Sequence, residues 1–328
     1  MDKTKVKKIL VIGLSNIGDA ILTTPVIEVL RENFPQAQLD LLSSQRASVV
    51  FKSDIRIDKK IIYDKSISWI EKLKLINRLK QDRYDLAVDL RQTAFNIFLG
   101  ARYHTSIFAR APKSLMHMKD RHLWKLKSLG LDISNVMSPS VMFGKDERNY
   151  INNLFNSWQI KEEDIVIALS PGARNMTKRW EKEGYRQLVE QLIKNYNTKI
   201  IMLGDDEDRV LAQEIARPFK TLGVFQAAGV TTISQLAHLL TRCRLLVSND
   251  SAVMHLGWAV NTPVVAIFGP TSHEKYAPQG AHDIVVRKEL DCSPCEESLC
   301  PEGQRQCMKS ISAEEVFLAC RKILNGKR

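Results

Sequence analysis

Residues 8–19, KILVIGLSNIGD, decide the fold of this chain. An aliphatic run is followed by a polar loop with two glycines and then by the amphipathic segment Asp19–Phe34. This order is typical of a strand that leads through a tight turn into a helix. The same alternation continues along the first half, with further strands predicted at Leu39–Leu42, Lys60–Tyr63 and Leu86–Asp89 and a helix at Ser66–Arg83. Strands that alternate with helices predict a parallel sheet.

The pattern restarts after a charged helical segment at Asp146–Trp158. The second set of strands is predicted at Ile165–Ser170, Lys199–Leu203, Leu245–Ser248 and Val264–Phe268. A length of 328 residues also suits two domains. We therefore predict an α/β chain of two doubly wound parallel-sheet domains, at 1–160 and 161–310, with a C-terminal helix at 311–328 that can pack back on the first domain. Ligands of such sheets bind where the strands end.

Charge is unevenly distributed along the chain. The net charge is +11, and residues 1–160 hold 26 Lys and Arg against 16 Asp and Glu. This half suits an anionic partner such as a phosphorylated lipid, an acidic bilayer or nucleic acid, although scattered solubilising lysines are the alternative. No apolar run has the length of a membrane span, and the first one is shorter than a signal-peptide core. We expect a cytoplasmic protein.

The first candidate site is the loop after the first strand, which contains Ser15, Asn16, Gly18 and Asp19. It lacks the GxGxxG spacing of a dinucleotide fingerprint, so a nicotinamide cofactor is not indicated. Asp19 falls at a helix N-terminus, which favours an ionised carboxylate that can act as a general base. The alternative is that Asp19 only caps or charges the helix.

Two loops of the second half carry groups that suit a diphosphate. Lys178 and Arg179 follow a strand and precede a helix, where cations and helix N–H groups can converge on phosphate; solvated charge is the alternative. A strand, turn and helix recur at 248–255, with Asp250, Ser251, Ala252 and His255 at the helix start. Thr271, in the turn after the next strand, can approach the same ligand, whereas His255 can instead be structural.

Acidic and cysteine clusters raise the question of a metal. Asp205–Asp208 begins a helix, so its carboxylates complement the helix dipole or form an Asp-x-Asp metal site, and one of them, such as Asp206, can hold ribose hydroxyls. Cys292, Cys295, Cys300 and Cys307 have the spacing C-x2-C-x4-C-x6-C. In a cytosolic chain this spacing indicates a structural zinc, or else reduced or partly oxidised structural cysteines.

Several of these motifs resemble one family when taken in order. They are Gly18-Asp-Ala-Ile-Leu-Thr-Thr-Pro25, Pro171-Gly-Ala173, Lys178-Arg-Trp180, Asn249-Asp-Ser251 with His255, and Phe268-Gly-Pro-Thr271. Over nearly the whole chain they are similar to the ADP-heptose:lipopolysaccharide heptosyltransferases of glycosyltransferase family nine. The resemblance implies a GT-B fold of two Rossmann-like domains facing across a cleft. It also implies an inverting transfer that requires no metal or other cofactor.

The resemblance also implies partners and residue roles. The C-terminal domain would bind ADP-heptose, and the N-terminal domain a lipid-linked lipopolysaccharide core acceptor at the cytoplasmic face of the inner membrane. Asp19 matches the family's proposed general base and Lys178 its diphosphate-binding lysine, while Asp250, Ser251 and His255 match the donor-binding turn. Thr231 or Thr232 falls where members contact the nucleoside. Many relatives have Gly at the position of Ala252, whose N–H can reach phosphate only if its φ is negative.

Three other functions remain as alternatives. A glycosyltransferase that uses a different nucleotide sugar would keep the same site. A nucleotide-dependent oxidoreductase or an epimerase fits the sheet topology but lacks the GxGxxG motif. A basic module that binds nucleic acid or a membrane surface would use the charge of residues 1–160 and would not need Asp19. Basic residues at Leu90–Asn96 and Ala111–Arg121, namely Arg91, Lys113, Lys119 and Arg121, are expected to contact the acceptor.

Overall fold

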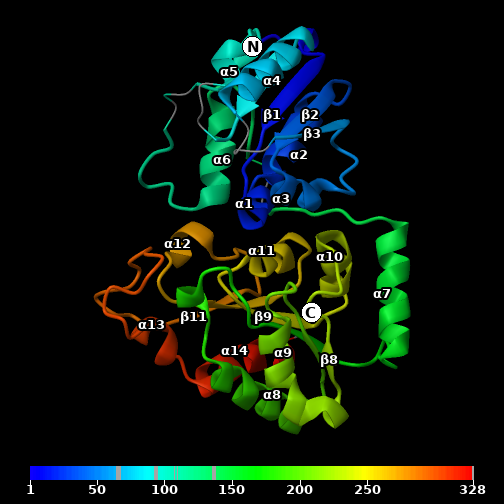
Figure 1. Cartoon of the computed structure of the whole chain (residues 1–328), viewed down its shortest axis with the longest axis vertical. Helices are drawn as coiled ribbons and strands as arrows, with labels where there is room; N and C mark the ends of the chain where they lie inside the picture. The colour runs from blue at the N-terminus through cyan, green and yellow to red at the C-terminus, as the bar shows by residue number, and fades with distance from the viewer. Residues whose placement is uncertain (64–67, 92–94, 107, 109, 135–137, 327–328) are drawn as a thin grey trace. The chain divides into compact units, whose positions relative to one another are not determined.

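Two separate parallel sheets organise the chain. A computed structural model describes residues 1–63, 68–91, 95–106, 108, 110–134 and 138–326. The first sheet has the strand order β3-β2-β1-β4-β5 and the second β11-β10-β9-β6-β7-β8. Within the described residues, the chain divides into two compact units, Met1–Met142 and Phe143–Arg328 (Figure 1). The predicted α/β class with two doubly wound parallel sheets is confirmed.

The elements of the first unit are β1 Lys8–Ile12, α1 Ile17–Leu22, α2 Thr24–Asn33, β2 Gln38–Ser43, α3 Gln45–Ser48, β3 Lys59–Ile62, α4 Trp69–Gln81, β4 Leu86–Asp89, α5 Phe95–Phe98, β5 Tyr103–His104 and α6 Met118–Lys127. The central strands β1 and β4 are almost wholly buried, since the sheet is covered on both faces. Short 3₁₀ turns, Lys3–Lys5 and Val49–Phe51, complete this unit.

The elements of the second unit are α7 Lys145–Ser157, β6 Val166–Ser170, the 3₁₀ turn Met176–Lys178, α8 Lys182–Tyr196, β7 Lys199–Met202, α9 Arg209–Ala216, the 3₁₀ turn Arg217–Leu222, β8 Val224–Gln226, α10 Ile233–Thr241, β9 Leu245–Asn249, α11 Ala252–Ala259, β10 Val264–Phe268, α12 His273–Tyr276, β11 Ile284–Arg287, α13 Gln306–Lys309 and α14 Ala313–Asn325. Strands β6, β9 and β10 are buried along their whole length. Their ends therefore set the position of the loops that follow them.

The helix predicted at Asp19–Phe34 is two helices. α1 ends at Leu22 and α2 begins at Thr24, with Thr23 between them. Pro25 has no N–H to continue the helical hydrogen bonds. The carbonyl oxygen of Ile21, which a residue at position 25 would otherwise bond, instead accepts the Thr24 hydroxyl at 2.8 Å. The proline therefore shortens α1 and keeps Asp19 in a single short turn of helix.

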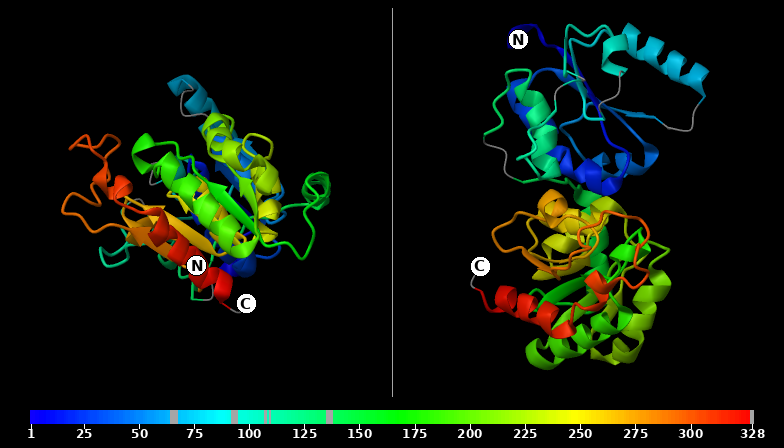
Figure 2. Two further views of the ribbon diagram at one scale, coloured as in Figure 1. Left: turned by 90° about the horizontal axis from the view of Figure 1, so that it is seen from below. Right: turned by 90° about the vertical axis from the view of Figure 1, so that its left-hand side faces the viewer.

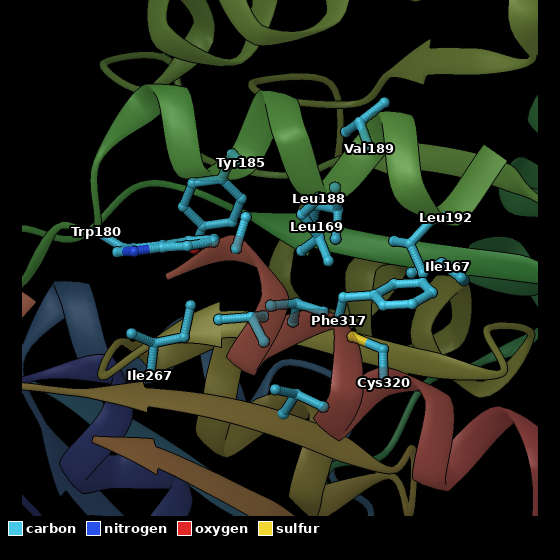
Figure 3. Close-up of a cluster of buried hydrophobic side chains, with 14 of the residues drawn as sticks. Ile167, Leu169, Trp180, Tyr185, Leu188, Val189, Leu192, Ile267, Phe317 and Cys320 are labelled. Carbon is cyan, nitrogen blue, oxygen red and sulfur yellow. The ribbon is translucent and has the colours of Figure 1, made fainter. Parts of the chain in front are cut away.

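The core of the second unit joins α8 to the C-terminal helix α14. Trp180, Tyr185 and Leu188 pack in one buried cluster with Phe317 and Cys320 of α14 (Figure 3). α14 lies beside α8, and Figure 2 shows these two helices as neighbouring red and green ribbons. The buried face of the C-terminal helix is thus used within the second unit.

The division between the units falls before α7, whereas the sequence analysis placed the boundary near residue 160. α7 contacts α10, and the flanking aromatic residues pack inside the second unit. Trp158 stacks on Phe225 with ring centroids 5.2 Å apart, and Phe143 lies 4.9 Å from the ring of His238. These contacts draw the helix into the second unit although its sequence is polar and charged.

Candidate functional site

Three neighbouring strands of the second sheet end at the loops that the sequence analysis selected. β9 lies between β6 and β10, with Ser170 opposite Ser248 and Ile267 opposite Asn249. The strands are parallel, so their carboxyl ends meet at one edge. The loops with Lys178, Asp250 and Thr271 therefore converge there.

Asp250 holds the side chains of the other two loops. Its Oδ2 atom accepts a hydrogen bond from Lys178 Nζ at 2.7 Å and another from Thr271 Oγ1 at 2.7 Å. The Asp250 side chain is 6% exposed, whereas that of Lys178 is 26% exposed. The ammonium group is thus fixed at a buried carboxylate while part of the lysine faces solvent. Such a tethered cation suits an anionic ligand.

Asn249 fixes the position of the loop that carries Lys178, a role that sequence reasoning missed. Its Nδ2 atom donates to the carbonyl oxygen of Pro171 at 2.8 Å, and its Oδ1 atom accepts from the backbone N–H of Trp180 at 3.1 Å. Asn249 is fully buried, so both bonds lie away from water. Trp180 adds a second anchor by donating its Nε1–H to the carbonyl oxygen of Ile311 at 2.9 Å.

α11 begins directly after the Asp250 turn. Ser251 is its N-cap, and its side chain makes no capping hydrogen bond, although its hydroxyl lies 3.2 Å from that of Ser248. Ala252 is the first helical residue, and its φ is not positive. Its N–H therefore keeps the orientation that phosphate binding needs. His255 is 5% exposed, which favours the structural interpretation of this histidine.

Arg179 and Asp208 form a second ion pair behind the Lys178 loop. Arg179 donates to Asp208 Oδ1 at 3.2 Å and to the carbonyl oxygen of Ala173 at 2.8 Å. Burial raises the pKa of Asp208, and Asp205 adds to the rise while Arg179 opposes it. A Cβ atom at Gly172 would overlap the Asp208 carboxylate, so glycine lets the loop lie close to this ion pair. Arg179 thus supports the loop in the absence of any ligand.

Asp206 lies in the loop between β7 and α9 and faces the turn that follows β8. It accepts a hydrogen bond from Arg209 at 2.6 Å, and its side chain is 81% exposed. Both side chains lie against Gly229, just before Thr231 and Thr232. Thr232 is the N-cap of α10 and forms a capping box with Gln235. Asp206 and the two threonines therefore flank one turn at the edge of the sheet.

Arg305 braces the Lys178 loop from the cysteine segment, and this contact was also missed from the sequence. Its guanidinium donates to the carbonyl oxygens of Met176 at 2.8 Å and Arg179 at 3.1 Å, and to the carboxylate of Glu181 at 2.7 Å. The same segment covers the turn after β10, because Ser293 Oγ donates to the carbonyl oxygen of Gly269 at 2.7 Å. The segment therefore supports two of the three loops.

None of the six cysteines, all of which lie in the described residues, forms a disulfide. The Cys300 sulfur accepts the backbone N–H of Arg305 at 3.4 Å, and backbone N–H groups lower the pKa of this thiol. Burial raises the pKa of Cys307, and the other three cysteines of the cluster raise it further. Among the described residues, no three or more His, Cys, Asp or Glu side chains have an arrangement that could hold a metal ion.

In the first unit, the loop after β1 places Asp19 in the first turn of α1. Asn16 is the N-cap and donates its Nδ2–H to Asp19 Oδ2 at 2.9 Å. Ser15 is held by its carbonyl oxygen, which accepts the Ser44 hydroxyl at 2.9 Å, and Gly18 directly precedes Asp19. Asp19 is half-buried and Asn16 is exposed. The carboxylate is thus oriented by its own loop and remains accessible.

A buried lysine lies at the end of β4, beside β1. Lys125 of α6 donates to the carbonyl oxygen of Leu90 at 2.6 Å, and burial lowers its pKa to about 8. α6 also contacts α1, the helix of Asp19. Among the predicted acceptor residues, Arg91 lies over the Tyr63 ring, and Lys119 is buried beside Asp120. Residues 92–94 of the predicted acceptor segment lie outside the described residues.

Comparisons with known proteins identify the family and the fold. The sequence model of glycosyltransferase family 9 (heptosyltransferase) matches residues 108–306. The chain is 27% identical to lipopolysaccharide heptosyltransferase 3 of Escherichia coli, over 94% of the chain and 95% of that protein. It is 25% identical to lipooligosaccharide heptosyltransferase 2 of Campylobacter jejuni, over 94% of the chain and 96% of that protein. The solved structure of the E. coli ADP-heptose lps heptosyltransferase II superposes with a TM-score of 0.78 at 23% identity, over 97% and 98% of the two chains.

Proposed function

Because the chain belongs to glycosyltransferase family 9 and has its GT-B-type fold, we propose that it transfers a heptose from ADP-heptose to a lipopolysaccharide core acceptor. The second unit binds the donor and the first unit binds the acceptor. The enzyme class follows from the family, whereas the donor sugar and the residue roles are parts of the proposal.

The tethered Lys178 carries the donor half of the proposal. Its ammonium lies at the edge of the sheet where β6, β9 and β10 end, held by Asp250, and α11 begins in the adjacent turn. A departing diphosphate gains negative charge in the transition state, so a positioned cation and free helix N–H groups stabilise it most at that moment. Asp206 and Thr231 or Thr232 flank the neighbouring turn and bind the nucleoside.

Asp19 is the proposed base that activates the acceptor. It removes the proton from the attacking acceptor hydroxyl, and the oxygen then displaces the ADP at the anomeric carbon with inversion. The proton passes to the Asp19 carboxylate, the new bond joins the acceptor oxygen to the sugar, and the electrons of the broken bond leave with the diphosphate. The Asn16 amide holds Asp19 during this step through its 2.9 Å hydrogen bond. The reaction as written uses no metal or other cofactor.

The location of the enzyme is also part of the proposal. We place it at the cytoplasmic face of the inner membrane, where a lipid-linked core acceptor would be presented. No helix in the described residues is long and apolar enough to cross a bilayer. The excess positive charge of residues 1–160 suits a phosphorylated acceptor.

The test is transfer of one heptose from ADP-heptose to heptose-deficient lipopolysaccharide, read by mass spectrometry. Asp19→Asn is expected to lower turnover by about 10²–10⁴-fold and leave ADP affinity unchanged. Lys178→Met is expected to weaken ADP binding by about tenfold or more, in line with the loss of a charge-assisted hydrogen bond. Matched controls are Asp132→Asn and Lys182→Met, which remove an exposed carboxylate and an exposed lysine from the same units.

The outcomes separate the parts of the proposal. Product with the wild type and with both controls, but not with Asp19→Asn, supports the assigned base. Full activity of Asp19→Asn would refute it. Absence of product with every truncated acceptor, combined with transfer from another nucleotide sugar, would show that the donor is wrong and the enzyme class right.

A further inference from the structure

α4 exposes large apolar side chains on a helix that is otherwise well formed. Trp69 is 69% exposed, Ile70 49% and Leu73 50%. Ser68 caps the helix, and with Glu71 it forms a complete capping box. Residues 69, 70 and 73 lie on one side of a helix, since positions three and four apart are neighbours. These side chains are therefore exposed by a folded helix rather than by a frayed end.

The opposite side of α4 is already used by the core. Leu79 is buried, and Leu75 packs against the cluster that also contains Leu10 and Tyr84. A helix that needed only to cover the sheet would have polar residues on its outer side. Trp69, Ile70 and Leu73 thus form a second apolar stripe for which the fold of the first unit has no use.

α5 extends this surface. Ile97 is 51% exposed and Phe98 60% exposed, while Phe95 at the start of the same short helix packs inward. α5 contacts α4, and Figure 1 shows the two helices side by side. We call Trp69, Ile70, Leu73, Ile97 and Phe98 the α4–α5 face. Exposed apolar groups gathered on adjacent elements mark interaction sites more often than scattered ones do.

The charges around the α4–α5 face indicate what covers it. α4 carries four basic residues, Lys72, Lys74, Arg78 and Lys80, and one acidic residue, Glu71. Trp, Phe and Leu beside lysines and arginines suit the boundary of an anionic bilayer. In that setting the rings enter the headgroup layer while the basic groups reach lipid phosphates.

We infer that the α4–α5 face docks this enzyme onto an anionic lipid surface. The occupant is the bilayer itself, with α4 lying in the interface. The inference rests on the proposed function to the extent that a lipid-linked acceptor gives the docking its use. Docking itself needs neither donor nor acceptor, and can therefore be measured separately.

The experiment is binding of the full chain to vesicles of phosphatidylglycerol and phosphatidylethanolamine, compared with phosphatidylcholine alone. Co-sedimentation is expected only with the anionic vesicles and is expected to weaken with salt. The double variant Trp69→Ser/Leu73→Ser is expected to lose at least tenfold in vesicle affinity. The matched control is Val210→Ser/Leu222→Ser, which removes two apolar side chains that are 64% and 52% exposed on the second unit.

Tryptophan fluorescence gives an independent readout. Trp69 is 69% exposed, whereas Trp124 and Trp158 are half-buried and Trp180 and Trp258 are buried. Most of a blue shift on addition of vesicles is therefore expected to come from Trp69. Trp69→Phe is expected to abolish most of that shift and keep most of the binding. Lys74→Glu/Arg78→Glu is expected to lower binding to anionic vesicles at least tenfold, because it reverses the charge that faces the lipid headgroups.

Three outcomes would overturn the inference. They are equal affinity of Trp69→Ser/Leu73→Ser and wild type for anionic vesicles, equal affinity for anionic and neutral vesicles, and a dimer in sedimentation velocity that the double variant dissociates. The last would assign the α4–α5 face to a second copy of the chain. Transfer to a delipidated core oligosaccharide is expected to be unchanged in the double variant. Its failure in the wild type would count against the proposed function and leave vesicle docking intact.

Discussion

The Lys178–Asp250 pair is expected to stabilise the second unit in the absence of any ligand. Asp250→Asn keeps the size of the side chain and an oxygen for Thr271, but removes the charge that Lys178 meets at 2.7 Å. Lys178→Met keeps the stem of the lysine and removes its ammonium. A double-mutant cycle of these two substitutions isolates the interaction between them.

The expected magnitude follows from the exposure of each partner. A hydrogen bond to a charged group contributes about 1.5–3 kcal/mol. The Lys178 side chain is 26% exposed, so water can solvate its ammonium when Asp250 is replaced. Asp250→Asn should therefore lower the free energy of unfolding by an amount near the lower end of this range. Lys178→Met leaves a carboxylate that is only 6% exposed with Thr271 alone, and should cost about 2–3 kcal/mol. We expect a coupling free energy of about 1.5–2 kcal/mol.

The assay is urea unfolding followed by tryptophan fluorescence in a Trp69→Phe/Trp124→Phe background. The three remaining tryptophans, at 158, 180 and 258, all belong to the second unit. The signal therefore reports the unit that contains the pair. If the losses of the two single variants add up to that of the double variant within about 0.5 kcal/mol, the expected coupling is refuted, because independent sites behave in that way.

Three further perturbations test contacts that support the Lys178 loop and the end of β4. Gly172→Ala is expected to destabilise the second unit by about 1–3 kcal/mol, because its Cβ would overlap the Asp208 carboxylate; urea unfolding measures this, and Asp208→Ala should relieve it. Arg305→Ala is expected to weaken ADP binding about three- to tenfold by releasing the Lys178 loop; calorimetry measures this, and unchanged affinity would contradict the brace. Burial lowers the pKa of Lys125 from 10.5 to about 8, so between these pH values the unfolded chain binds a proton at Lys125 that the folded chain has lost. The free energy of unfolding should therefore rise as pH increases from 8 to 10. Lys125→Met should flatten that rise in urea unfolding measured at several pH values.

The central strands could be predicted from the sequence because burial on both faces demands continuous aliphatic runs. The strands at β1, β4, β6, β9 and β10 were found in this way. The edge strands β5 and β8 were not, since they are only two and three residues long. β11 was also missed, although it contains the aliphatic run Ile284–Val286, and this strand is only half-buried. The doubly wound topology then placed the loops after β1, β6, β9 and β10 at strand ends, which is why candidate residues could be chosen before their contacts were known.

The contacts that hold those residues could not be predicted in the same way, because they join segments far apart in the chain. Asn249 forms hydrogen bonds with residues 171 and 180, and Arg305 forms hydrogen bonds with residues 176, 179 and 181. A hydrogen bond of this kind leaves no periodic signal, and neither an asparagine after a strand nor an arginine in a cysteine-rich segment is unusual by itself. The cysteine spacing drew attention to a metal, whereas the residue of that segment that reaches the Lys178 loop is Arg305. The position of Lys178 therefore depends on the chain more than 120 residues away as well as on its own turn.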